Sequence, residues 1–188
     1  MAKPTDQTDV LLVAATDIEL CGHVGFVCGV GPVEAAAATA RELALRPPRV
    51  VLHVGIAGAR GITPGGLVVG GEAVYCDISA EVPVVERVEP DGDLLASVRA
   101  AIPEALVLPI GTSASVGGSA RDAHRDLRVE AMEGFAVLRA CASAGIPAIE
   151  VRAISNELSE GDRSRWRIGR ALEAISDALP RLLAAVAE

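Results

Sequence analysis

The sequence is short of aromatic residues, of basic residues and of long apolar runs, and each shortage excludes a class of protein. Only four aromatic side chains occur among 188 residues, namely Phe26, Tyr75, Phe135 and Trp166. They are too few for the aromatic platform on which single-stranded nucleic acids stack. Acidic residues outnumber Lys and Arg by 25 to 17, and the formal net charge of −8 repels a nucleic-acid backbone. We therefore expect no nucleic-acid partner.

Long apolar stretches are also missing, although 51% of the residues are hydrophobic. Gly, Pro and charged residues interrupt every apolar run before it approaches the ~20 residues that a membrane-spanning helix needs. Residues 1–9 are polar and contain no apolar core of a signal peptide. We expect a protein that neither enters a membrane nor is exported.

The few cysteines and histidines follow no metal-binding or disulfide spacing. The four cysteines, Cys21, Cys28, Cys76 and Cys141, contain no CxxC pair, which is typical of a reducing cytosol. The three histidines are His23, His53 and His124. Their scatter matches no zinc motif, so we expect a cytoplasmic protein with no metal and no other cofactor.

What the sequence does contain is a regular alternation of short apolar runs and helical patterns. Predicted strands span residues 10–15, 25–28, 49–54, 67–69, 72–75, 105–110 and 146–154, and predicted helices span 32–45, 91–101, 133–144 and 166–186. This alternation predicts an α/β fold with a largely parallel or mixed sheet. Because no linker, repeat or low-complexity block interrupts it, we expect a single domain over residues 1–188.

Glycine-rich segments follow several predicted strands. A tight turn at Gly29-Val-Gly31 precedes Pro32, which suits the first position of a helix, and a second glycine-rich turn is expected over residues 55–61. In such sheets the binding site lies at the carboxyl ends of the strands. The loops that begin near Ala15, Gly29, Gly55, Gly111, Val129 and Ser155 should therefore build the site.

No single loop identifies a chemistry. Gly29-Val-Gly31 lacks the third glycine of a dinucleotide-binding fingerprint, and no P-loop lysine is present. Taken singly, Glu19 and Asp162 match ordinary solvated carboxylates, and Glu133 matches a helix start favoured by the dipole.

Taken in order, however, the segments resemble the nucleoside phosphorylase and nucleosidase superfamily over nearly the whole chain. They are Ala15-Thr-Asp-Ile-Glu19, Gly29-Val-Gly-Pro-Val-Glu-Ala-Ala36, Val54-Gly-Ile-Ala-Gly58, Val129-Glu-Ala-Met-Glu-Gly134 and Arg152-Ala-Ile-Ser-Asn156. Within the superfamily the chain looks most like the futalosine hydrolase family, nucleosidases of the alternative menaquinone pathway. The resemblance implies a single-domain nucleoside-phosphorylase-like fold, with a central mixed β-sheet flanked by helices, and a homo-oligomer, a dimer or higher.

The implied reaction breaks the N-glycosidic bond of a small-molecule nucleoside through an oxocarbenium-like sugar. It requires an activated water, a grip on the ribose and help for the departing base. By resemblance, Glu19 activates the water and Glu133 binds the ribose hydroxyls. The other residues that match substrate-binding positions are Met132 beside the sugar, Ile56, Ala57 and Gly58 along the base and sugar, and Ser155 and Asn156 facing the purine.

The sequence favours hydrolysis over phosphorolysis. Phosphorylases of the superfamily hold phosphate with basic residues, but the first loop offers Asp17 and Glu19, and the Gly29 loop has no Arg or Lys before Arg41. Two carboxylates near a phosphate would repel it.

Asn156 stands where nucleosidases that act on adenine nucleosides carry Asp. An Asn amide can donate to O6 of hypoxanthine and accept from its N7–H, a pairing that an ionised Asp cannot make. We therefore interpret Asn156 as selecting a 6-oxopurine, while Asp162 or a water supplies the N7 proton. The alternative is that Asn156 only caps the strand end through local hydrogen bonds.

Four other functions remain open from the sequence. A methylthioadenosine or adenosylhomocysteine nucleosidase conflicts with Asn156, and a purine nucleoside phosphorylase conflicts with the missing basic loop. A non-catalytic nucleoside-binding protein would not need both Glu19 and Glu133, and a structural assembly protein would not need so many small-residue turns. Arg60, Arg163 and Arg165 are candidates for holding the acidic, aromatic end of a futalosine-like substrate.

Overall fold

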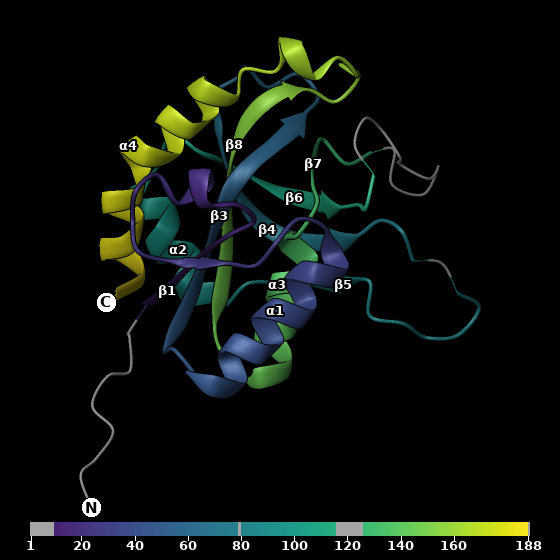
Figure 1. Ribbon diagram of the computed structural model, residues 1–188, viewed down its shortest axis with the longest axis vertical. Helices are drawn as coiled ribbons and strands as arrows, with labels where there is room; N and C mark the ends of the chain where they lie inside the picture. The colour runs from purple at the N-terminus through teal and green to yellow at the C-terminus, as the bar shows by residue number, and fades with distance from the viewer. Residues whose placement is uncertain (1–9, 79, 116–125, 188) are drawn as a thin grey trace, which may run out of the picture.

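The structure is a computed structural model that describes residues 10–78, 80–115 and 126–187, so His124 lies outside the described residues. Within them, eight strands form one sheet (Figure 1). The strands are β1 (Val10–Ala14), β2 (Phe26–Val27), β3 (Val50–Ala59), β4 (Leu67–Tyr75), β5 (Arg87–Val88), β6 (Leu106–Thr112), β7 (Val129–Ala131) and β8 (Ala148–Glu157). The helices are α1 (Pro32–Leu45), α2 (Gly92–Ala101), α3 (Gly134–Ala144) and α4 (Ile168–Ala187), with 3₁₀ turns η1 (Asp17–Leu20) and η3 (Arg163–Arg165).

The sheet is mixed, as the sequence predicts. Its order is β2-β1-β3-β7-β6-β4-β5, and β8 pairs with both β3 and β4. The pairings of β3 with β8, β8 with β4, β4 with β6, β6 with β7 and β7 with β3 therefore close a ring of five strands. The ring brings the ends of β3, β7 and β8 together.

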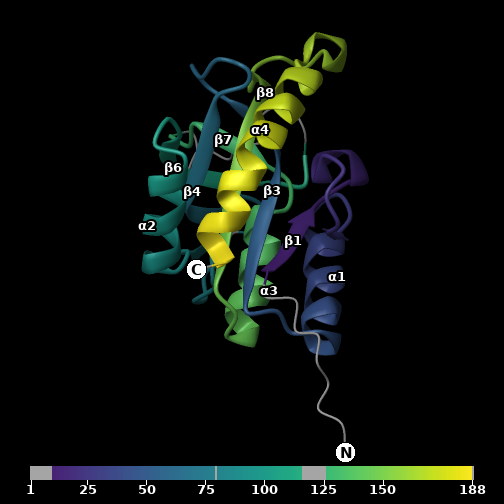
Figure 2. The same ribbon diagram turned by 90° about the vertical axis from the view of Figure 1, so that its left-hand side faces the viewer.

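Helices cover the sheet on two sides (Figure 2). The amphipathic pair α2 and α4 packs on one side, in a core that includes Leu52, Ile149 and Leu179. The other pair, α1 and α3, packs over a second core built around Val13, Val51 and Leu138. In the described part of the chain, no helix combines the length and apolarity needed to cross a membrane.

The glycine-rich turn predicted over residues 55–61 is wrong in its first half. Strand β3 continues through Gly55 and Gly58 to Ala59, because β8 pairs with it along this stretch and β7 pairs with Gly58 and Ala59. The ladder of β3 with β8 shifts register between Ala57 and Gly58, and the extra residue of this bulge is Ser155 of β8. The glycines here serve close packing against side chains of β8 rather than a change of chain direction.

Other element boundaries also differ from the prediction. β4 is one strand across Gly70 and Gly71, with a register shift at that point, where two strands were expected. β8 extends to Glu157 and includes Ser155 and Asn156, which were expected to follow the strand. The short strands β5 and β7 were not predicted. α1 matches the prediction at both ends, since Pro32 begins it and Pro47-Pro48 follows it closely.

Candidate active site

Glu19 is held rigidly although it lies on a short 3₁₀ turn after β1. Its Oε2 accepts hydrogen bonds from the Thr16 backbone N–H, at 3.1 Å, and from the Thr16 hydroxyl, at 2.7 Å. Its Oε1 accepts from the Ile56 N–H of β3 at 3.0 Å. Only 6% of Glu19 is exposed. Three donors therefore hold this carboxylate in place against β3.

Glu133 is the second buried carboxylate of the site, and a donor at the start of α1 holds it in place. It ends the bend between β7 and α3, and its Oε1 accepts from the Gly31 N–H at the start of α1, at 3.0 Å. The positive end of the α1 dipole favours an anion at this place. Burial nevertheless raises the pKa of Glu133, against the lowering effects of Arg152 and of the Gly31 N–H.

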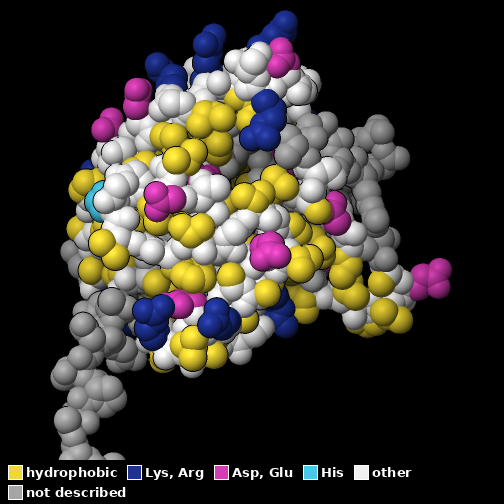
Figure 3. Space-filling model, in the orientation of Figure 1, with side chains coloured by type: hydrophobic (Ala, Val, Ile, Leu, Met, Phe, Trp, Pro, Cys, Tyr) yellow, Lys and Arg dark blue, Asp and Glu magenta, His cyan; other side chains and the backbone are white. Residues whose placement is uncertain are grey.

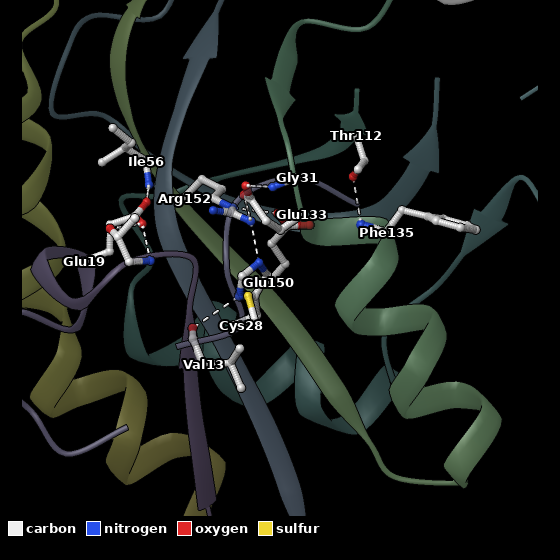
Figure 4. A network of polar contacts seen from close by, with 12 residues as sticks. Val13, Glu19, Cys28, Gly31, Ile56, Thr112, Glu133, Phe135, Glu150 and Arg152 are labelled. Carbon is white, nitrogen blue, oxygen red and sulfur yellow. Dashed lines mark hydrogen bonds and ion pairs between the residues drawn. The ribbon is translucent and has the colours of Figure 1, made fainter. Parts of the chain in front are cut away.

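Arg152 lies between the two carboxylates (Figure 4). Its side chain is fully buried, and its Nη2 is 3.7 Å from Glu133 Oε2. Burial lowers the pKa of this guanidinium, but the carboxylates of Glu150, Glu133 and Glu19 outweigh that effect and raise the pKa overall. Arg152 therefore stays charged, and its charge is shared by three carboxylates from three parts of the chain.

Gly55 allows this approach. A Cβ at Gly55 would overlap Nη1 of Arg152 and lie 2.7 Å from Glu19 Oε1. Nη1 itself is buried and has no hydrogen-bond partner among the described residues. The lack of a side chain at residue 55 thus leaves one donor of Arg152 directed beside the Glu19 carboxylate.

The residues predicted to face the base form a neighbouring group. The Ser155 hydroxyl lies 3.2 Å from the Ala57 carbonyl oxygen and 2.7 Å from Asn156 Oδ1. Asn156 Nδ2 donates to the Glu157 carbonyl at 3.0 Å, and a Cβ on Gly58 would lie 3.0 Å from that nitrogen. In this structure both ends of the Asn156 amide are engaged locally, as the strand-capping alternative expects.

Met132 and Asp162 take no part in the hydrogen bonds described above for the two buried carboxylates or for the Ser155–Asn156 pair, and their surroundings differ from each other. Met132 is half-buried in the bend just before Glu133. Asp162 is exposed and caps η3, where it accepts from the backbone N–H and the hydroxyl of Ser164. Those hydrogen bonds lower the pKa of Asp162. A carboxyl group with a lowered pKa is ionised near neutral pH and holds no proton to donate, which does not favour the role suggested for it from the sequence.

The sequence assigned no role to five of the residues that build the site. Arg152 and Glu150 lie within an apolar run that was expected to be a buried strand, and charges at positions i and i+2 of such a strand are a signal because they share a face. His53 lies opposite Glu150 on β3, a pairing that depends on strand register. Gly31 contributes through its backbone N–H, which no side-chain pattern reveals. Thr16 contributes its backbone N–H and its hydroxyl in a capping box with Glu19, and the spacing of these two residues is visible in the sequence.

Comparison with known proteins places this chain in a family. The family model of the phosphorylase superfamily matches residues 21–188, so the chain belongs to the phosphorylase superfamily. Within it, the chain belongs with the futalosine hydrolases. It is 37% identical to the futalosine hydrolase of Streptomyces coelicolor, over 84% of this chain and 77% of that protein. It is 34% identical to that of Acidothermus cellulolyticus, over 97% of this chain and 81% of that protein.

Solved structures support the fold. A methylthioadenosine/adenosylhomocysteine nucleosidase from Colwellia psychrerythraea, solved in complex with adenine, superposes with a TM-score of 0.83 at 20% identity, covering 94% of this chain and 95% of that one. The native futalosine hydrolase of Helicobacter pylori superposes with a TM-score of 0.82 at 16% identity, covering 93% of this chain and 97% of that one. The predicted nucleoside-phosphorylase-like fold is confirmed.

Proposed function

We propose that this protein hydrolyses the N-glycosidic bond of futalosine and releases hypoxanthine. The observation that carries the proposal is the pair of buried carboxylates, Glu19 and Glu133, on two sides of the Arg152 guanidinium. Similarity to the futalosine hydrolases supports the choice of substrate. A nucleosidase needs one group to activate water and another to hold the sugar, and these two carboxylates can divide those tasks.

In the proposed reaction a water oxygen adds to C1′ of the ribose as the bond from C1′ to the purine breaks. Glu19 accepts the proton that the water loses, and the departing hypoxanthine gains one. The free Nη1 donor of Arg152 lies beside Glu19 and can orient the water oxygen. Glu133 accepts hydrogen bonds from the ribose hydroxyls, with Met132 beside the sugar. Fixed charges near C1′ stabilise the positive charge that develops there.

Recognition of the base is assigned to the group at the end of β8. Ile56, Ala57 and Gly58 line the base and sugar, and Ser155 and Asn156 face the purine. The hydrogen bond that Asn156 Nδ2 makes to Glu157 is exchanged for one to O6 of hypoxanthine when the substrate binds. A water delivers the N7 proton in this scheme, since Asp162 is engaged in capping η3.

The decisive experiment incubates the protein with futalosine, inosine and methylthioadenosine, each with and without phosphate, and identifies the free base by chromatography. We expect hypoxanthine from futalosine without phosphate. A strict phosphate requirement with a sugar phosphate as co-product would show a phosphorylase. Adenine from methylthioadenosine as the main product would show the 6-amino nucleosidase instead.

The cellular setting follows from the same substrate. Futalosine hydrolysis is a step of the alternative menaquinone pathway, so we place the protein in menaquinone biosynthesis. The described cysteines are all free thiols, and three of them are buried. Free thiols suit the reducing cytoplasm, where we place the enzyme.

We also propose that two copies of this chain pair through the α1–α3 face. A groove of about 600 Å³ runs between these helices and is lined mainly by apolar residues, among them Ala36, Phe135 and Ala140. Val33 lines the groove with 77% of its surface exposed. Figure 3 shows further hydrophobic side chains across the face that carries α1. An apolar surface of this kind is typical of an interface.

The test is the mass in solution by size-exclusion chromatography with light scattering. We expect twice the chain mass of 19.2 kDa or a higher multiple, and a shift to monomer in Val33→Glu. The matched control is Val85→Glu, because Val85 is also exposed but does not line the groove. A wild-type monomer at all concentrations would contradict the pairing.

A further inference from the structure

The Arg152 side chain is surrounded by more polar machinery than the proposed reaction uses. Glu150 and His53 are both fully buried, yet neither is placed to contact substrate in the scheme above. Glu150 lies two residues before Arg152 on β8, so the two side chains share a face of the strand. His53 lies opposite Glu150 in the register of β3 and β8. Buried polar groups cost free energy unless they are paired, so this cluster calls for a role.

Each guanidinium nitrogen of Arg152 has a different environment. Nε donates to Glu150 Oε1 at 2.6 Å. Nη2 donates to Nε2 of His53 and also faces Glu133. Nη1 has no partner among the described residues and is directed to the gap at Gly55 beside Glu19. Two partners thus fix the plane of the guanidinium, and the remaining donor is left for the reaction.

His53 can only accept from Arg152 if it is neutral. Burial and then the nearby Arg152 charge hold the pKa of His53 well below its usual value. Its Nδ1 lies 3.2 Å from the Val13 carbonyl oxygen, so the single ring proton sits on Nδ1 and Nε2 is free to accept. The carbonyl of β1 therefore sets the tautomer that Arg152 requires.

Gly134 makes room for Glu150. A Cβ at Gly134 would overlap both carboxylate oxygens of Glu150. The residue at position 134 must therefore be small, because Glu150 of β8 occupies the space that a side chain there would need. The space left at two glycines, 55 and 134, admits Arg152 and Glu150 respectively.

We propose that Glu150 and His53 are positioning residues that hold Arg152 so that its free Nη1 orients the water activated by Glu19. The expected effect on kcat rests on the proposed hydrolysis. The hydrogen bonds that hold Arg152 do not depend on which substrate the enzyme uses. Neither residue touches the nucleoside. Their loss should therefore lower kcat and leave KM nearly unchanged.

The variants come in matched pairs. His53→Gln keeps an acceptor near Nε2, whereas His53→Leu removes it at similar size. Glu150→Gln keeps an acceptor for Nε of Arg152, whereas Glu150→Leu removes it. Glu104→Gln is the control, because it makes the same change at an exposed pair with Arg181, away from the site. Melting temperatures are measured for all of them, and kcat is expressed per folded molecule.

We expect each Leu variant to lose roughly 100-fold in kcat with KM within about threefold, the scale on which a small misplacement acts. Each Gln variant should recover about tenfold of that loss. Glu104→Gln should match the wild type. Wild-type kcat in folded Leu variants would overturn the inference, and so would Gln variants as impaired as the Leu ones. If a Leu variant fails to fold, the Gln variants still test the inference. Wild-type kcat in both Gln variants, together with an Arg152 Nε–H that is not protected from exchange in the wild-type protein, would then overturn it.

A measurement without substrate separates this inference from the proposed function. In ¹⁵N–¹H spectra, Arg152 Nε–H should give a slowly exchanging resonance, assigned by its loss in Arg152→Lys. Glu150→Leu should abolish its protection from exchange, and Glu150→Gln should shift the resonance while keeping protection. A wild-type spectrum without this protected signal overturns the inference. A protein with the signal but inactive on every nucleoside overturns the proposed hydrolysis instead.

Discussion

At the scale of single residues, Glu19 and Asn156 differ in how the fold holds them. Glu19 accepts three hydrogen bonds and lies beside a donor of Arg152 that has no partner within the described part of the chain. Asn156 is engaged with its immediate neighbours in the chain. In the proposed reaction the first arrangement fixes the general base before substrate arrives, whereas Asn156 must exchange hydrogen-bond partners when the purine binds. The two residues therefore call for different tests.

Glu19→Gln should leave binding largely intact while kcat falls by roughly two to four orders of magnitude, the usual worth of a positioned base. The amide retains an acceptor for the Ile56 N–H but cannot take a proton from water. Titration calorimetry with futalosine gives binding, and hypoxanthine release gives kcat. A nearly fully active Glu19→Gln would contradict the water-activating role.

Asn156→Asp should lose activity on futalosine and gain discrimination in favour of the 6-amino analogue. An ionised carboxylate would oppose O6, an acceptor against an acceptor, at a cost of roughly 1–3 kcal/mol. The exocyclic amine of the analogue can donate to it. The measurement is kcat/KM for both substrates on both proteins. An unchanged ratio would mean that Asn156 only caps the strand through Ser155 and Glu157.

At the scale of elements, the junction of β7 and α3 is tightly packed against β8. Glu133 ends the bend and Gly134 begins the helix. The carboxylate of Glu150 occupies the place of a Gly134 side chain. The start of α2 offers a contrast, since Gly92 is also a first helical residue and a Cβ there would meet nothing within 4 Å.

Gly134→Ala should therefore destabilise the protein by roughly 1–3 kcal/mol, the range for overpacking a core. Gly92→Ala should stabilise it by about 0.4–1 kcal/mol, because alanine restricts the unfolded chain. Adding Glu150→Ala should relieve the clash at Gly134, so the two changes would be non-additive. Urea unfolding of the single and double variants measures this coupling. Additive effects would mean that the helix start adjusts without touching Glu150.

How much the sequence predicts depends on whether the cause is local or long-range. The bounds of α1 follow from prolines within or beside the helix, so they could be predicted locally. The sequence also singled out Glu19 and Glu133, and the fold brings both carboxylates close to the Arg152 guanidinium. The course of β3 through Gly55 and Gly58 depends on pairing with β7 and β8, which are distant in sequence. The contacts of Arg152 with Glu150 and His53 depend on the same pairing, so local patterns could not reveal them.

At the scale of the whole molecule, the buried carboxylate of Glu133 makes stability depend on pH. Burial raises the pKa of Glu133 above the ordinary value of 4.5. The folded protein therefore binds more protons than the unfolded chain in the range between those two values. The stability associated with Glu133 is present below the unfolded pKa and is lost as pH rises through the folded one.

Glu133→Gln should remove this dependence. The free energy of unfolding of the variant relative to the wild type should increase as pH rises above about 4.5 and then level off. Glu104→Gln should show a small effect of opposite sign, because the hydrogen bond from Arg181 lowers the pKa of this exposed carboxyl. Urea unfolding between pH 4.5 and pH 8, at roughly half-unit steps, compares the three proteins. Parallel curves for Glu133→Gln and the wild type would contradict the assignment.

The outermost strands of the sheet, β2 and β5, have only two residues each. An exposed strand edge is a template on which another chain can add by backbone hydrogen bonding, the first step toward fibrous aggregates. Two residues offer a short template for such growth, and each of the inner five strands pairs along both edges because they close into a ring. We therefore expect the addition of another chain to this sheet to be confined to β2, β5 and residues 10–12 of β1, while crowded chains meet mainly through helix faces.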